Sequence, residues 1–139
     1  MIDPQALFYS SIEDITISQI KRGIYDHSTD ITPLQNWMQK YDIHALVEGS
    51  DNTHYKFSGV KSKPHIVYYQ GDISLLNKQL LAIVGPREPT IYGKKIVETL
   101  FNSLREYDIA TISGMAPGVD QYAHQLSQDN AIPTIAVLG

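Results

Sequence analysis

The pattern that most constrains this chain is an alternation of short apolar segments with amphipathic ones between residues 81 and 138. Three runs have the length and apolar content of buried strands: 81–84, 109–113 and 134–138. Between them, residues 91–107 and 118–128 carry apolar side chains at helical spacing. Strands that alternate with helices form parallel sheets with right-handed crossovers. The sequence therefore predicts an α/β fold: a Rossmann-like parallel sheet that comprises a βαβαβ half.

The first sixty residues predict a small, mainly helical N-terminal segment. Residues 12–24 carry isoleucines at a loose helical spacing, and residues 32–41 place apolar side chains on one helical face. Thr32 has a hydroxyl typical of an N-cap, and Pro33 suits the first helical position. Residues 48–59 predict a loop or a weak extended piece.

The segment around Lys61 indicates a junction, because Pro64 forces the preceding residue out of helical space. Residues 65–69 then predict a strand that ends in a Gly-Asp turn. We therefore expect two parts, a helical or irregular segment over 1–60 and a partial Rossmann-like ligand-binding domain over 61–139.

The sequence ends at Gly139, at the carboxyl end of the third predicted strand. A doubly wound sheet usually continues for several more strands, and a final parallel strand lacks a crossover helix to cover it. We therefore expect a truncated chain, whether an engineered piece, a shortened reading frame or a proteolytic fragment. We also expect a second copy or the N-terminal segment to cover the exposed third strand.

Composition excludes several kinds of site. The chain has no Cys, which excludes disulfides, Cys-based metal sites and a Cys nucleophile and fits a reducing cytoplasm. No apolar run approaches the roughly 20 residues of a membrane helix, so we expect no membrane partner. The histidines are scattered without metal-ligand spacing, and we expect neither a metal nor a cofactor. Because the net charge is −4, any phosphate site must be local.

Two loops follow neighbouring predicted strands, GPREPT after residues 81–84 and SGMAPGVD from the last residue of 109–113. In open α/β sheets, ligands bind at the carboxyl ends of the strands. Glycine lets the backbone approach an anion, and the helix that follows directs its N-terminal amides to the same point. Arg87 adds a guanidinium suited to phosphate, and Ser113 a hydroxyl donor. The pattern predicts a phosphate pocket.

Spacing by itself leaves a second interpretation open, in which both loops are merely tight strand-to-helix turns. The chain has neither a G-x-G-x-x-G dinucleotide fingerprint nor a G-x-x-x-x-G-K-[ST] phosphate loop.

Three segments in order, AIVGPREPTIYG, TISGMAPGVDQYAH and TIAVLG, resemble the DNA-processing protein A (DprA/Smf) family. The resemblance covers residues 55–139 well, residues 37–54 faintly and the first thirty-odd residues hardly at all. It implies a cytoplasmic, dimeric protein that binds single-stranded DNA and helps to load the RecA recombinase in natural transformation (competence). The family is not established as enzymatic, so the resemblance implies DNA recombination without catalysis.

The resemblance places Gly85 and Arg87 in the family's G-S-R motif, whose arginine is implicated in DNA backbone binding. Two residues depart from the family pattern: Pro86 replaces a serine, and Pro117 replaces a residue that is often arginine. Both changes remove donors, which implies weak DNA affinity. The predicted DNA- or phosphate-binding residues are Gly85, Arg87, Tyr92, Lys94, Ser113, Gly114, Met115, Ala116 and Gly118.

Two other functions stay open. Related folds bind nucleotide-derived ligands or hydrolyse nucleotides, and Asp120 and His124 stand four apart on one helix face, as an acid/base pair could. The glycine-rich loop itself carries no carboxylate to assist such cleavage, so we predict that Asp120 is a first-turn helix carboxylate and that His124 ties its helix to the next loop. The last possibility is an inactive, truncated remnant.

Overall fold

A computed structural model describes residues 19, 22, 28, 30–48, 60–61 and 63–138. The chain divides into two compact units, Met1–Ile73 and Ser74–Gly139. The helix predicted over 12–24 and the loop predicted over 48–59 lie outside the described residues, apart from Gln19, Arg22 and Glu48. Within the part of the chain that the structure describes, no helix has the length and apolarity to cross a membrane.

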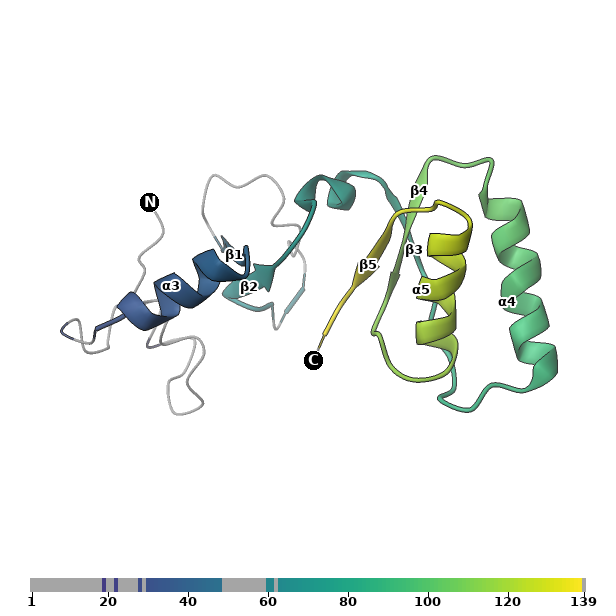
Figure 1. Ribbon diagram of the computed structural model, residues 1–139, viewed down its shortest axis with the longest axis horizontal. Helices are drawn as coiled ribbons and strands as arrows, with labels where there is room; N and C mark the ends of the chain where they lie inside the picture. The colour runs from purple at the N-terminus through teal and green to yellow at the C-terminus, as the bar shows by residue number, and fades with distance from the viewer. Residues whose placement is uncertain are drawn as a thin grey trace. The chain divides into compact units, whose positions relative to one another are not determined.

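The first unit contains helix α3 (Thr32–Lys40) and an antiparallel pair of strands, β1 (His44–Val47) and β2 (Ile66–Tyr69) (Figure 1). Strand β2 was predicted, but β1 was not. Strand β1 is only four residues long and is defined by its pairing with a partner some twenty residues away. Because β2 pairs with β1, it lies in the first unit, whereas the sequence analysis placed residues from 61 onward with the second.

Helix α3 begins one residue earlier than predicted. Thr32 is the first helical residue and Ile31 is the N-cap, so the prediction that Thr32 is the N-cap was wrong. Asp30 Oδ1 accepts the Thr32 amide hydrogen at 2.9 Å, and the N-cap itself has no side-chain hydrogen bond. Hydrogen bonding from Thr32 lowers the pKa of Asp30.

The second unit is the predicted parallel sheet. The strands are β3 (Gln79–Ala82), β4 (Ile109–Ser113) and β5 (Thr134–Ala136), in the order β3-β4-β5 with both pairings parallel. Helix α4 (Ile91–Leu104) connects β3 to β4, and α5 (Val119–Asp129) connects β4 to β5. A short 3₁₀ helix, η1 (Ile73–Asn77), precedes the sheet. The α/β, Rossmann-like prediction is confirmed.

The element ends differ from prediction by two or three residues. Strand β3 runs over 79–82 rather than 81–84, because Gln79 already pairs with Ile109. Helix α4 stops at Leu104 rather than residue 107. The N-terminus of α4 is capped by Thr90, whose Oγ1 accepts the Gly93 amide hydrogen at 3.1 Å.

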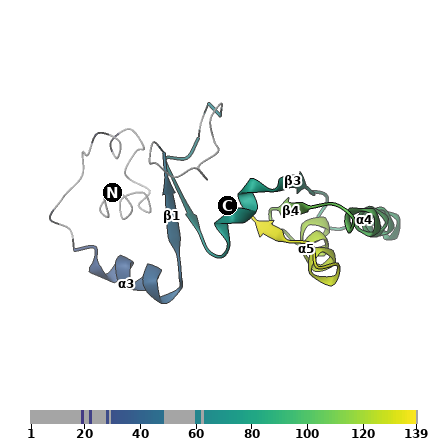
Figure 2. The ribbon, with the colours of Figure 1, turned by 90° about the horizontal axis from the view of Figure 1, so that it is seen from above.

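Both helices lie on one side of the sheet in Figures 1 and 2. Between helices and sheet is a core of buried apolar side chains: Ile83, Phe101, Leu104, Ile109, Val119, Ala123 and Ile132. Inside it, Thr111 of β4 and Ser127 of α5 share a buried hydrogen bond of 2.7 Å. This packing fixes the start of α5 against the end of β3, where the two predicted loops meet.

Candidate anion-binding site

The two loops interlock through their backbones. The Val119 amide donates a hydrogen bond of 3.2 Å to the Pro86 carbonyl oxygen, which joins the second loop to the first. Gly118 has φ +97°, and a Cβ placed there would lie 2.4 Å from the carbonyl oxygens of Pro86 and Arg87. A Cβ on Gly85 would lie 2.7 Å from a methyl carbon of Val119. Both glycines are therefore required by the contact between the loops.

Asp120 lies at the centre of this junction. Its Oδ1 accepts the Gly85 amide hydrogen at 3.3 Å, and its Oδ2 accepts the Gly114 amide hydrogen at 3.2 Å. The side chain is only 7% exposed and stands in the first turn of α5, where the helix dipole favours a negative charge. A Cβ on Gly114 would lie 3.0 Å from Oδ2, so Gly114 does admit an anion closely, and that anion is the carboxylate of Asp120.

Several polar groups at the loops are thus engaged within the chain. The amides of Gly85 and Gly114 donate to Asp120. The Ser113 hydroxyl is buried and donates to the Ile83 carbonyl oxygen at 2.6 Å. Pro86 and Pro117 have no amide hydrogen to offer. The amides of Gly85 and Gly114 are therefore not open to a ligand, and Pro86 and Pro117 add none.

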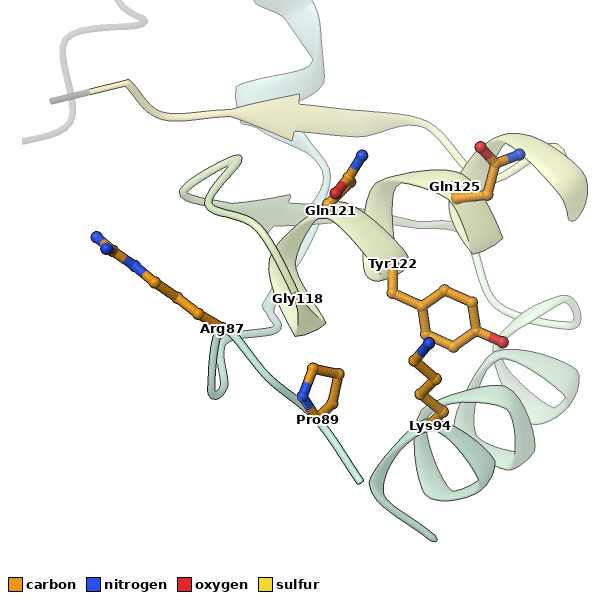
Figure 3. Close-up of a pocket in the computed structure, with 7 residues that line it drawn as sticks. All are labelled: Arg87, Pro89, Lys94, Gly118, Gln121, Tyr122 and Gln125. Atoms are coloured by element: carbon orange, nitrogen blue, oxygen red, sulfur yellow. The ribbon is translucent and has the colours of Figure 1, made fainter. Parts of the chain in front are cut away.

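A cavity of about 380 Å³ opens beside the junction, between the first loop and the facing sides of α4 and α5 (Figure 3). Of the nine predicted site residues it brings together Arg87, Lys94 and Gly118. The structure adds four residues that sequence reasoning missed: Pro89, Gln121, Tyr122 and Gln125. In the sequence, the only indication for Gln121, Tyr122 and Gln125 was their position on the polar side of α5. That position is equally typical of a helix face that contacts solvent.

The remaining predicted residues do not line this cavity. Tyr92 and Met115 are exposed, at 75% and 56% of their surfaces, and Met115 has a positive φ of 59°. The Ala116 carbonyl oxygen accepts the Gln121 amide hydrogen at 3.1 Å.

The two cations of the cavity point in different directions. Lys94 reaches from α4 toward Tyr122, with its Nζ 5.6 Å from the centre of the ring, while Arg87 extends away from both (Figure 3). The Tyr122 hydroxyl donates to the carboxylate of Glu98, and this hydrogen bond raises the pKa of Tyr122. Arg87 is exposed, and among the described residues its side chain has no hydrogen bond or ion pair.

Asp120 and His124 do not form an acid/base pair with each other. The Asp120 carboxylate is bonded to two amides, while His124 Nδ1 lies 2.8 Å from Thr134 Oγ1, at the start of β5. The predicted first-turn position of Asp120 is confirmed, whereas His124 contacts the first residue of β5 and not the loop before it. No group of three potential metal ligands occurs among the residues that the structure covers.

Comparison with known proteins gives a consistent result. Residues 46–139 match the sequence model of a family described as DNA recombination-mediator protein A. The chain is 31% identical over 110 residues to DNA processing protein DprA of Streptococcus pneumoniae, covering 79% of this chain but only 38% of that protein. The chain therefore spans well under half the length of this relative.

Two solved structures are similar. The structure of DprA from S. pneumoniae superposes with a TM-score of 0.68 at 24% identity, over 96% of this chain and 50% of that one. DNA processing protein A from Helicobacter pylori, whose single-stranded DNA binding mode was the subject of that structure, gives a TM-score of 0.57 at 34% identity, over 70% and 43% of the two chains. The similarity to the S. pneumoniae structure supports the Rossmann-like fold described above.

Proposed function

The chain belongs to the DNA recombination-mediator protein A family, and from this premise we propose that the cavity beside Arg87 binds the sugar-phosphate backbone of single-stranded DNA. The observation that carries the proposal is the placement of Arg87 and Lys94 on one cavity with their charged ends directed apart. Phosphates spaced along a strand can meet two such cations separately, whereas a single phosphate group cannot easily reach both.

The engagement of two glycine amides at the loops supports a polyanion over a mononucleotide. Tight sites for one phosphate usually converge several backbone amides on it. Here the amides of Gly85 and Gly114 donate to Asp120. The H. pylori relative, at 34% identity, also supports DNA as the ligand. Since the net charge is −4, we expect low affinity that falls with salt and depends little on sequence.

For the whole protein we propose a role in DNA uptake, natural transformation and RecA-dependent recombination, in the cytoplasm, with a RecA-type recombinase as partner and as a homodimer. The family resemblance supports these points. We propose that the protein acts by binding rather than catalysis, because Asp120 and His124 are both engaged in structural contacts.

Fluorescence anisotropy with a labelled oligo-dT at low salt tests this function, with thymidine monophosphate as competitor. We expect saturable binding that millimolar monophosphate does not displace. Displacement at concentrations well below that range would show that the site takes a nucleotide-derived ligand. Absence of any binding would favour an inactive remnant.

A further inference from the structure

We propose that Asp120 is a positioning residue that takes the place of a bound anion, so that the two loops are held in their DNA-binding arrangement before DNA arrives. This inference rests on the proposed function of the cavity. Asp120 does not line the cavity, so its contribution to DNA binding would pass through the backbones of the two loops that it joins.

The geometry of the carboxylate carries the inference. An ionised carboxylate can only accept hydrogen bonds, and each Asp120 oxygen takes one amide from a different loop. At 7% exposure, the charge has little water around it. Among the residues that the structure describes it has no salt bridge, so the two amides and the start of α5 stabilise it.

The positions of the two amides explain how this contact would affect DNA binding. Gly85 precedes Arg87 by two residues, so fixing its amide fixes the backbone that carries the guanidinium. Gly114 begins the loop that ends at Gly118, which packs against the carbonyl oxygens of Pro86 and Arg87. The Asp120 side chain thus holds both loops of the junction that carries Arg87.

The same contacts define an opposite role, which makes the inference testable. In that role the Asp120 carboxylate competes with a DNA phosphate for the two glycine amides. Removing the charge would then strengthen DNA binding. If Asp120 is instead a positioning residue, removing the charge weakens DNA binding, so the two roles differ in sign.

The first test compares Asp120→Asn with the wild type by oligo-dT anisotropy over a range of salt and by amide hydrogen exchange. The asparagine keeps only one oxygen acceptor. We expect roughly tenfold weaker DNA binding, and faster exchange at Gly85 or Gly114 but not in strand β4. The dependence of log K on log salt should keep its slope, because no cation that contacts phosphate is lost. Glu106→Gln removes an equal charge from an exposed position. This control should change neither the DNA affinity nor the exchange of the Gly85 and Gly114 amides.

Tighter DNA binding by Asp120→Asn, or a reduced salt slope, would overturn the proposal. Should the variant not fold, wild-type hydrogen exchange decides. Protection of the Gly85 and Gly114 amides in the free protein is expected, and protection that arises only with oligo-dT would contradict it. If the wild type binds no oligo-dT, the proposed function fails, while exchange in the free protein still decides whether Asp120 holds the loops.

Discussion

The junction between the two loops and the rim of the adjoining cavity are close neighbours, yet different contacts constrain them. In the junction, Gly118 and Gly85 face atoms that leave no room for a Cβ, and Asp120 is buried with both oxygens bonded. On the rim, Arg87 and Lys94 are exposed, and Arg87 has no bonded partner among the described residues. The junction is thus fixed by packing and hydrogen bonds, whereas the rim beside it is open to a ligand.

This difference indicates what each part contributes. Changes in the junction should loosen the two loops or lower the free energy of unfolding, and DNA binding should fall only as a consequence. Changes on the rim should lower DNA affinity and leave unfolding as it is. A rim residue that proves essential for folding, or a junction glycine that tolerates a side chain, would break the comparison.

The largest effect is expected for Gly118→Ala. The new Cβ would lie 2.4 Å from two carbonyl oxygens at a positive φ, and we expect a loss of about 3 kcal/mol or more in the free energy of unfolding. Urea denaturation of the 139-residue chain measures this loss.

Gly71→Ala is the matched control for that variant. Gly71 has a similar φ of +91°, but a Cβ there would meet nothing within 4 Å. We expect only the backbone cost of about 1–2 kcal/mol. Equal losses in the two variants would mean that backbone conformation, and not contact between the loops, explains Gly118.

A smaller effect is expected from Lys94→Ala on the rim. Loss of one exposed ammonium that meets a phosphate should weaken oligo-dT binding about threefold, since exposed charge contacts are worth up to about 1 kcal/mol. Lys95→Ala is the control, because Lys95 is also exposed on α4 but does not line the cavity. Similar losses in both variants would indicate a general charge effect without a local site.

The smallest effect concerns Tyr122→Phe and appears in the pH dependence of stability. The hydrogen bond to Glu98 raises the pKa of Tyr122, so its stabilising contribution is present at neutral pH and is lost as pH rises above roughly 10. The wild type should exceed Tyr122→Phe by about 0.5 kcal/mol or less, since solvent screens the pair. Thermal unfolding from pH 7 upward should show this margin shrinking; a margin that grows with pH would have the wrong sign.

The parallel sheet could be predicted because its signals are local. Apolar runs and helical spacing placed β4 at 109–113 to the residue, whereas β3 shifted by two residues because its pairing with Ile109 decides where it starts. Strand β1 was missed for the same reason, since a four-residue strand depends on its partner. The start of α3 lies one residue before the position that the Thr32 hydroxyl indicated, with the Thr32 amide donating to Asp30.

The site could be predicted only in part. Parallel topology brings both loops to one sheet edge, so sequence order was enough to pair Arg87 with Gly118. The sequence also indicated that glycines would admit an anion, but it could not show that Asp120 supplies one. Tyr122 and Gln121 enter the cavity through the packing of α4 beside α5, which no local pattern specifies.

The central claim is that Arg87 binds DNA and does not hold the fold together. Anisotropy of labelled oligo-dT at several salt concentrations, with wild type and Arg87→Ala, tests it most directly when paired with thermal unfolding of both proteins. We expect the variant to lose about 1.5–3 kcal/mol of binding free energy and about one unit of salt slope, with an unchanged unfolding midpoint. Equal binding by both proteins, or a lowered midpoint that accounts for the lost affinity, would contradict the claim.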